Sequence, residues 1–426
     1  MGDSEAHASP HDDAIPVIIV GAGPVGLLLA LRLAQSNIRS VVLEQETALG
    51  TAPRAIGYYG PVHDVFKEAG IYDQVAKEGM ASGGYAWRTL PTDDGKGTKT
   101  LGYSIQLAQC RLAEIMLEEA TKTGLTEVLW DHRVTGLSQD EGGVTITAVS
   151  GQGESRSFRG LYLAGCDGGK SNIRKLLGIP LAGHSWPERF VATDILRTAP
   201  VVADPPVHFT VDPRYWAVVT PLEHVKPGVR GLWRYSMAVP AYEEADDGSK
   251  TVLTDEQVLE PSYVDSLLLR QIDGPRPTDH TVMRKSLYKM HQLLASTMHR
   301  GRCFLAGDAA HINNPIGGLG LCTGLLDADA LHQTLEIVRR TIDPQAVFAR
   351  YSAERRRVFQ NIIHPFSSAN KTRLHSADPE DTAREDWYFQ ALRRGDAKEL
   401  GQIHAPLYNS WRTNMWDLIA TSLKDA

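Results

Sequence analysis

Apolar residues near the start of the chain gather in short runs separated by a glycine-rich turn and a helical segment. Residues 15–20 (IPVIIV) and 40–44 (SVVLE) are runs of strand length, and residues 27–36 (LLLALRLAQS) have helical spacing. The turn between the first run and the helix is GAGPVG, residues 21–26. Strand, turn, helix and strand within about 30 residues are typical of a βαβ unit. Because a parallel strand covered on both faces is apolar throughout, the pattern predicts a buried parallel sheet.

The pattern changes further along the chain. Alternating apolar and polar positions over 129–149 and 152–163 predict antiparallel strands. Long alternating runs that are rich in aromatic residues, between 181 and 287, predict a second sheet. The other predictions from the pattern are helices at 61–69, 72–78 and 110–123, a strand at 103–106, a return of the α/β pattern at 301, and a mainly helical chain after 342.

These elements predict an α/β fold in which a Rossmann-like domain is split by an inserted β-rich domain and followed by a helical C-terminus. The predicted division, in chain order, is a disordered tail at 1–14, the first part of the Rossmann-like domain at 15–180, the β-rich domain at 181–290, the second part of the Rossmann-like domain at 291–365, and the helical segment at 366–426.

Composition narrows the class of protein. The 426 residues carry a formal charge of −7 with scattered basic residues, which argues against a nucleic-acid partner. No apolar run reaches the roughly 18 residues of a membrane span, and the polar, acidic start does not match a secretory signal. The four cysteines and 15 histidines show no metal-ligand spacing, so we expect no metal site and a cytoplasmic protein with reduced thiols. The sequence does not determine the oligomeric state, and a homodimer is one possibility.

The GAGPVG turn predicts dinucleotide binding. Gly21 allows the tight turn, Gly23 lets the backbone approach a pyrophosphate, and Gly26 lets the helix pack closely on the strand. Glu44 ends the next strand, near the ~20-residue spacing expected for a carboxylate on a ribose hydroxyl.

A second glycine-rich stretch, GDAAHINNPIGGLGLCTG at 307–324, selects among dinucleotides. Asp308 follows the apolar run CFLA and can accept a hydrogen bond from a sugar hydroxyl. Pro315 and the GGLG run let the backbone pass close to a flat ring, and a helix starting near Gly320 aims its amides there. Such amides stabilise negative charge, as on a reduced flavin. A nicotinamide dinucleotide needs no such second site, so the stretch favours FAD, and the Rossmann-like domain is predicted to be an FAD-binding domain.

A third motif, CDGGKSNIR at 166–174, completes a resemblance. With the two glycine-rich turns in this order, the chain resembles the single-component flavoprotein aromatic hydroxylases, the family of p-hydroxybenzoate hydroxylase, over roughly the first 365 residues. The resemblance implies an FAD-dependent monooxygenase. In this family NAD(P)H reduces non-covalently held FAD, and O₂ then forms a flavin C4a-hydroperoxide that hydroxylates a phenolic or related small aromatic substrate.

The resemblance also implies roles for individual residues. Glu44 would bind the adenosine ribose, Arg111 the phosphates or ribityl chain, and Asp308 the ribityl hydroxyls. Asp167 and Arg174 would hold a turn that serves FAD and NAD(P)H, although a solvated helix start explains Arg174 and Lys170 equally well. The other residues expected to contact FAD are Arg54, Ala55, Pro315, Gly318, Gly320 and Leu321. The chain departs from the family pattern at Leu319, often Gln, and at Cys322, usually Asn.

The inserted sheet is predicted to roof the flavin and supply the catalytic residues. Arg234 could stabilise a phenolate, and Tyr235 or Tyr215 could orient the substrate or relay its proton. Arg234 and Tyr235 are neighbours on one strand, so only one of them can face inward. Further candidates are His208, Trp216 and Trp233, with Gly57–Tyr59 on the flavin side. His311, beside the flavin turn, is interpreted as a structural histidine.

Two alternative functions remain open from the sequence. On the same scaffold, the chain could be an epoxidase or a hydroxylase of a non-phenolic ring in secondary metabolism. In a different class, it could be a non-catalytic flavin-binding module, which would bind FAD without substrate-stimulated consumption of NAD(P)H.

Overall fold

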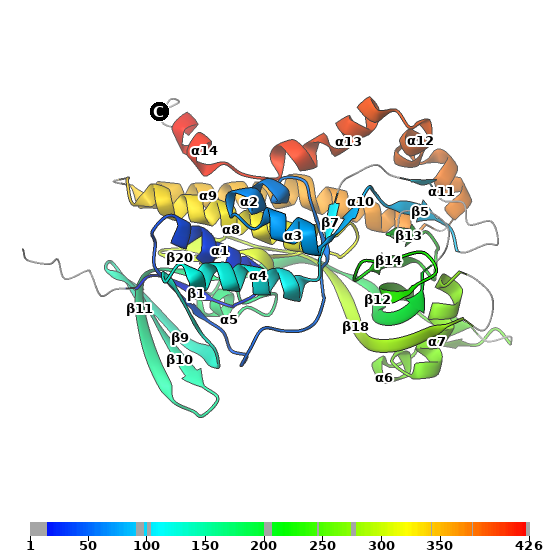
Figure 1. Cartoon of the computed structure of the whole chain (residues 1–426), viewed down its shortest axis with the longest axis horizontal. Helices are drawn as coiled ribbons and strands as arrows, with labels where there is room; N and C mark the ends of the chain where they lie inside the picture. The colour runs from blue at the N-terminus through cyan, green and yellow to red at the C-terminus, as the bar shows by residue number, and fades with distance from the viewer. Residues whose placement is uncertain are drawn as a thin grey trace, which may run out of the picture.

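The fold was analysed in a computed structural model of the chain (Figure 1). The structure describes residues 15–90, 98–99, 104–199, 207–244, 247–273, 278–341, 343–376 and 378–422. The predicted disordered tail at 1–14 lies outside the described residues.

The first sheet contains the predicted βαβ unit. Its central strands run in the order β20–β11–β1–β2–β8, and all of these neighbours are parallel. The two predicted alternating segments form an antiparallel extension, in which β10 pairs with β9 and with the start of β11. The strands of this sheet are β1 (Ile15–Val20), β2 (Ser40–Leu43), β8 (Thr126–Leu129), β9 (His132–Asp140), β10 (Gly143–Ser150), β11 (Ser155–Gly165), β19 (His299–Arg300) and β20 (Cys303–Leu305).

Helices pack on the parallel part of this sheet (Figure 1). Helix α1 (Pro24–Gln35) is apolar on nearly every side because it lies between the sheet, α4 (Gln109–Lys122) and α8 (Leu319–Val338). Nearby lie helices α2 (Val62–Glu68), α3 (Tyr72–Glu78), α5 (Asn172–Leu176) and α9 (Pro344–Val358), with the short sheet β3 (Gly57–Tyr59), β4 (Met80–Ser82) and β7 (Ser104–Gln106).

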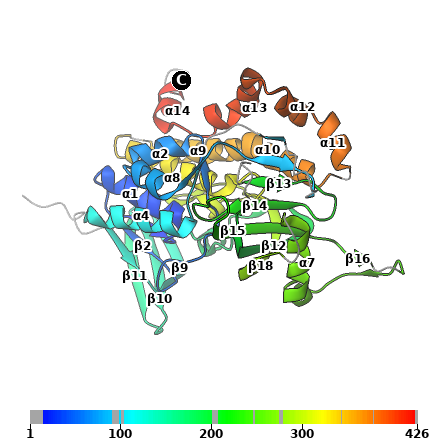
Figure 2. The same ribbon diagram turned by 45° about the vertical axis from the view of Figure 1, so that its right-hand side comes forward.

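The second sheet is antiparallel over most of its width and holds the long predicted strands. Its order is β21–β18–β12–β15–β14–β13–β5–β6, and Figure 2 shows it beside the first domain with α7 against one face. Strand β5 (Ala86–Arg88) belongs to the predicted first domain in sequence but pairs with β13 of this sheet. The remaining elements here are β6 (Thr98–Lys99), β12 (Leu181–Thr198), β13 (His208–Thr210), β14 (Ala217–Pro221), β15 (Arg230–Val239), β18 (His280–Ala295), β21 (His311–Ile312), the hairpin β16 (Glu243–Glu244) and β17 (Lys250–Thr251), α6 (Asp255–Val258) and α7 (Pro261–Gln271).

The chain after the second sheet is helical, as the pattern predicts, and runs back over the first domain (Figure 1). It continues from α9 through a π-helical turn (Phe359–Ile363) into α10 (His364–Leu374), α11 (Pro379–Glu385), α12 (Trp387–Arg394), α13 (Ala397–Ser410) and α14 (Met415–Ser422). Trp411, between α13 and α14, is completely buried in the core of the first domain. None of the helices among the described residues is long and apolar enough to cross a bilayer.

Candidate active site

A large cleft, with a volume of about 1760 Å³, lies between the first domain and one face of the second sheet. All three sequence motifs contribute to its walls, together with the loop that follows β2 and the C-terminal helices. The cleft therefore joins segments nearly 300 residues apart in sequence, as the two glycine-rich turns predict.

The GAGPVG turn lies at one end of this cleft. Gly21 has a φ of +106° and no room for a side chain, because Cβ would meet the Cys166 carbonyl. At Gly23 the space for a Cβ is open and belongs to the cleft, so the backbone there is free to approach a ligand. Gly26 does not line the cleft; a Cβ would clash with the Gly21 carbonyl, so its role is close packing of helix on turn. Glu44 lines the same end and accepts a hydrogen bond from the Ala22 amide at 2.7 Å.

The second glycine-rich stretch lies deeper in the cleft. The Asp308 side chain opens on it and has no hydrogen-bond partner among the described residues. The surrounding protein displaces bulk water and raises the pKa of this carboxyl above its usual value. Gly318, with a φ of +67°, is the N-cap of α8, and Pro315, Gly320 and Leu321 line the wall beside it. A further contact closes this loop, because the Tyr59 hydroxyl donates to the Gly317 carbonyl.

Buried polar residues hold the second turn from behind. The Asp327 carboxylate, on α8, accepts hydrogen bonds from the Gly307 amide at 3.0 Å and from His311 Nε2 at 2.6 Å. Its other oxygen lies 2.7 Å from Arg355 Nε. Burial opposes ionisation of Asp327, but the neighbouring His311 and Arg355 hold the pKa of this carboxyl below its usual value. His311 is therefore a buried structural histidine, as interpreted from the sequence.

The third motif supports the second glycine-rich turn. Asp167 accepts hydrogen bonds from the Ser171 hydroxyl at 2.5 Å and from the Asn172 amide at 2.7 Å, so it fixes the start of α5. The buried Arg174 guanidinium donates to the Ala309 carbonyl at 2.9 Å and the Gly169 carbonyl at 3.0 Å. Arg174 thus joins this motif to the Asp308 turn and does not lie at a solvated helix start, whereas Lys170 is exposed at the cleft.

Two of the helices that begin at the cleft, α1 and α8, leave their first amides for a ligand. Neither α1 nor α8 has a side-chain cap on its first turn, and Gly23 and Gly318, their N-cap residues, both line the cleft. Helix starts without caps are ready-made sites for phosphate or for a ring that carries negative charge. Together with the open position at Gly23 and the unpartnered Asp308, these features fit a single dinucleotide. Its adenosine diphosphate part would lie at one end of the cleft and its flavin at the other.

The roof of the cleft is one face of the second sheet. Arg234 is the residue of the predicted catalytic set that lines it. Its Nε and Nη2 lie 2.7 and 2.9 Å from the two carboxylate oxygens of Asp194, and its Nη1 donates to the Arg54 carbonyl. Arg54 has a φ of +42°, a left-handed conformation that is costly for a residue with a side chain and typical of functional loops.

The structure places the other predicted catalytic residues away from the cleft. Tyr235, next to Arg234, points to the opposite face, where it is fully buried and its hydroxyl accepts from Arg197. Tyr215 packs on that side as well, with its hydroxyl toward Glu243 and the Arg270 guanidinium over its ring. Neither Tyr235 nor Tyr215 therefore faces the cleft, which corrects the prediction that they contact the substrate. The physical reason is that helix α7 buries this second face of the sheet and leaves it closed to a ligand. His208, Trp216 and Trp233 also do not line the cleft.

Arg111 also lies outside the cleft walls. Its guanidinium is held by Glu78 at 2.6 Å and by Glu114 at 2.9 Å. The start of its helix does reach the cleft through Gln109 and Cys110, which the sequence analysis did not select. The backbone amide of Gln109 donates to the Pro53 and Ala55 carbonyls, so the segment that holds the predicted contact residues Arg54 and Ala55 forms one wall with the start of α4.

The sequence analysis missed the contribution of the C-terminal helices. Phe366, Asn370, His404, Leu407, Tyr408 and Trp411 all line the cleft. No motif marks these positions, and they come from a segment whose contact with the cleft depends on how the last helices dock.

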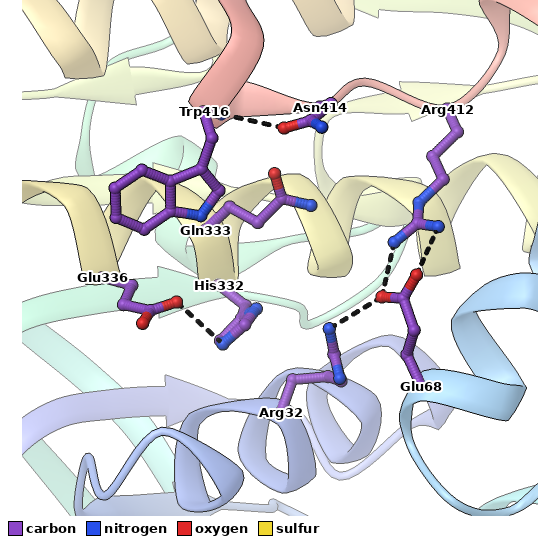
Figure 3. A pocket seen from close by; sticks show the side chains of 8 residues that line it. All are labelled: Arg32, Glu68, His332, Gln333, Glu336, Arg412, Asn414 and Trp416. Carbon is purple, nitrogen blue, oxygen red and sulfur yellow. Dashed lines mark hydrogen bonds and ion pairs between the residues drawn. The ribbon is translucent and has the colours of Figure 1, made fainter. Parts of the chain in front are cut away.

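A polar pocket of about 390 Å³ shows how the end of this segment is anchored (Figure 3). Glu68 lies between Arg412, at 2.6 Å, and Arg32, at 3.0 Å, as the dashed lines in Figure 3 mark. Arg412 also reaches the buried Asp329 at 3.0 Å. The charges of the pocket therefore pair with one another and fix the segment after Trp411 on α1, α2 and α8.

Comparisons with known proteins agree with this geometry. A family model described as "FAD binding domain" matches residues 14–365. The para-nitrophenol 4-monooxygenase of Pseudomonas sp. (strain WBC-3) is 32% identical over 388 residues, which cover 88% of this chain and 91% of that protein. The 6-hydroxy-3-succinoylpyridine 3-monooxygenase HspB of Pseudomonas putida (strain DSM 28022 / S16) is 30% identical, covering 87% of this chain and 91% of that protein.

A solved structure gives the same result. The crystal structure of p-nitrophenol 4-monooxygenase PnpA from Pseudomonas putida DLL-E4 superposes with a TM-score of 0.82 at 31% identity. The match covers 94% of this chain and 99% of that one, so the relationship includes the C-terminal helices. The predicted fold class and the predicted cofactor are confirmed: the chain belongs to the FAD-binding-domain family, as an FAD-dependent monooxygenase of the aromatic hydroxylase type.

Proposed function

We propose that this enzyme uses NAD(P)H and O₂ to oxygenate a hydroxylated aromatic ring at the carbon opposite the ring hydroxyl. The observation that carries the proposal is the continuity of the cleft. It runs from the FAD-binding motifs into a chamber between the roof sheet and the C-terminal helices. There a flat ring can lie beside the wall formed by Pro315, Gly317, Gly318, Gly320 and Leu321, called the flavin wall below.

The chamber has the lining expected for an aromatic substrate. Phe190, Phe209 and Val218 contribute from the roof, and Phe366 contributes from α10. The ring of Phe209 stacks on Trp87 with centroids 4.7 Å apart, which makes a rigid apolar wall. These walls exclude water from the reacting ring, which protects the oxygenation step from unproductive side reactions.

Bound FAD supplies the redox chemistry, taking two electrons from NAD(P)H and activating O₂. The residues of the chain position the reactants. The first amides of α8 would stabilise negative charge on a flavin ring bound beside them. Arg234 provides a guanidinium group on the roof, and its two bonds to Asp194 fix the orientation of that group. Two of its five N–H groups remain for a ligand oxygen. A phenolate pushes electrons toward the carbon opposite its oxygen, so stabilising that anion favours attack there.

The names of the two relatives support this position on the ring. Each describes oxygenation at a carbon that already carries a substituent, a nitro group at position 4 or a succinoyl group at position 3, directly opposite the ring hydroxyl. For 4-nitrophenol, a carbon–oxygen bond forms at position 4 and the carbon–nitrogen bond breaks. Nitrite leaves with the electron pair, a quinone remains, NAD(P)H supplies two electrons, and the second oxygen atom leaves as water.

The test uses the FAD-loaded enzyme with 4-nitrophenol, 6-hydroxy-3-succinoylpyridine and nitrobenzene, which lacks the hydroxyl. Anaerobic addition of NADH or NADPH should bleach the flavin, faster with the two hydroxylated rings than with nitrobenzene. When ¹⁸O₂ replaces air, the quinone from 4-nitrophenol should carry one labelled oxygen, with one nitrite released for each NAD(P)H consumed. Bleaching without labelled product for any hydroxylated ring would reject the proposal.

A further inference from the structure

We propose that His404 is the base that accepts the proton of the substrate's ring hydroxyl, an inference that rests on the proposed function. His404 lies on α13, beyond the residues matched by the family model, and lines the cleft. The sequence analysis did not select it.

The hydrogen bond made by one nitrogen of the His404 ring fixes the protonation state of the other nitrogen in the neutral ring. Nδ1 of His404 lies 2.9 Å from the Leu400 carbonyl oxygen, one helical turn earlier. A carbonyl can only accept, so Nδ1 carries the proton. In the neutral ring, Nε2 therefore has a free lone pair, and none of the described residues hydrogen-bonds to it. This is the arrangement of a base whose basic atom is left for a ligand.

The position of His404 in the cleft is next to the flavin wall. Its ring lies 6.2 Å from Phe366 on α10, and Asn370 follows one turn later on that helix. Asn370 approaches Gly317, because a Cβ built at that glycine would lie 3.2 Å from its Nδ2. Leu407 and Tyr408, one turn after His404, line the cleft as well. His404 thus faces the end of the cleft where the substrate ring is proposed to lie.

None of the neighbouring groups described below forms an ion pair with His404 or takes up the proton that its ring is proposed to accept. Tyr388 on α12 has its ring 6.3 Å away, and its hydroxyl lies 3.3 Å from that of Tyr85. Burial raises the pKa of Tyr388 well above its usual value, so it stays a neutral phenol. Arg373, on α10, lies over the ring of Tyr388 and is bound by Asp386 at 3.0 Å. Within the described part of the chain, no ion pair joins His404 to a charged side chain.

The proposed step moves one proton and no electrons. The O–H bond of the bound ring breaks and an Nε2–H bond forms, which leaves a phenolate beside an imidazolium. The enzyme thereby gains an activated ring even at a pH where the free substrate is still protonated. The proton returns to solvent after the product leaves.

The test compares His404→Gln with His364→Gln, a histidine on α10 that lies outside the cleft lining and contacts His184. Oxidised holoenzyme is mixed with 4-nitrophenol at a pH below the pKa of the free phenol, and the absorbance of the bound ligand is recorded. We expect yellow phenolate on the wild type and on the His364 variant, and protonated phenol on the His404 variant. Its kcat/KM should fall about 100-fold at this pH and recover as the pH rises and free phenolate appears.

A second measurement needs no variant. Calorimetric titration of the wild type with 4-nitrophenol, in two buffers of different ionisation enthalpy, counts the protons released on binding. Transfer to His404 predicts phenolate bound with no proton released, and release of one proton would overturn the inference. Phenolate on a folded, FAD-loaded His404→Gln enzyme with a wild-type pH profile would also overturn it. If labelled oxygen still enters the product in either case, the proposed function stands without this base.

Discussion

Arg355 donates from Nε to Oδ1 of Asp327 across 2.7 Å, and both side chains are completely inaccessible to solvent. The other oxygen of Asp327 holds the Gly307 amide and His311. This buried pair therefore lies directly behind the turn that presents Asp308 to the cleft.

Asp327→Asn should lower the free energy of unfolding by about 3–5 kcal/mol, because it leaves the Arg355 charge buried without its partner. It should also weaken FAD binding to the folded protein, since the Asp308 turn loses its support. Asp329→Asn is the matched control: this buried carboxylate lies on the same helix but pairs with Arg412 and Arg32, away from the turn. Urea unfolding should show a loss for both variants, whereas flavin-fluorescence titration should show weaker FAD binding for Asp327→Asn alone. Equal FAD affinity in the two variants would contradict the positioning role.

The two glycine-rich turns could be predicted from sequence because their chemistry is local. The strand, the turn and the helix start that make each site are contiguous in the chain, so residues such as Gly23 and Asp308 are found where the motifs place them. Arg111 shows the limit of this reasoning. The helix was located correctly, but its first turn faces the cleft through Gln109 while Arg111 pairs with Glu78.

The roof and the C-terminal wall could not be predicted for two physical reasons. Strand β15 is covered on both faces, by the cleft residues on one side and by α7 on the other, so alternation alone does not tell which of Arg234 and Tyr235 faces the substrate. His404 reaches the cleft only because Trp411 and Arg412 dock the last helices on the first domain. That docking depends on contacts between residues hundreds of positions apart, which carry no local pattern.

Gly23→Ala and Gly26→Ala should separate cofactor binding from folding. At Gly23 the space is open and φ is −74°, so alanine fits the apoprotein but puts a methyl group where the pyrophosphate is expected. At Gly26 a methyl group clashes with the Gly21 carbonyl, which cannot move without disrupting the turn. We expect the Gly23 variant to unfold at the wild-type temperature without FAD and to lose FAD affinity. The Gly26 variant should be unstable even as the apoprotein. Unchanged FAD affinity in Gly23→Ala would argue against a pyrophosphate at this turn.

Asp308→Asn should weaken FAD binding by about 10- to 100-fold, the effect of losing a hydrogen bond to a charged acceptor. The carboxylate has no partner of its own among the described residues, so its loss should leave the apoprotein stable. Arg111→Ala serves as the comparison, because its guanidinium pairs with Glu78 and Glu114 and does not line the cleft. Fluorescence titration of both apoproteins with FAD gives the two dissociation constants. A larger loss for Arg111→Ala would restore the role that the family resemblance implies for it.

Arg234→Ala should reduce kcat/KM by about 10- to 100-fold while the protein retains its flavin, because the roof loses the charge that faces the ring and the bond to the Arg54 carbonyl. Tyr235→Phe, one residue along the strand, removes a hydroxyl on the opposite face and should leave turnover unchanged. Steady-state rates with the best substrate of the panel, together with the flavin absorbance of the purified variants, measure both effects. Loss of turnover in Tyr235→Phe but not in Arg234→Ala would contradict this prediction, because the substrate would then depend on the face of the sheet that α7 covers.

Protonation of Glu188 should lower the stability of the folded enzyme in acid. Its Oε1 lies 2.6 Å from Lys371 Nζ and 2.7 Å from His375 Nδ1, so it joins the roof strand β12 to helix α10 beside the substrate chamber. Burial acts to raise the pKa of this carboxyl, but the hydrogen bonds from His375 and Lys371 outweigh it and lower the pKa from 4.5 to about 2.

A carboxyl whose pKa is lower in the folded state stabilises the fold above its unfolded pKa and loses that contribution as the pH falls toward the folded value. The loss from Glu188 should therefore occur between pH 4.5 and about pH 2. Thermal unfolding of wild type and Glu188→Gln over this range, with a reference at about pH 7, measures it. We expect the difference in Tm between the two proteins to be largest at the reference pH and to shrink steadily with acid, because glutamine has no proton to gain. A constant difference would show that the ion pair to Lys371 contributes nothing that depends on ionisation.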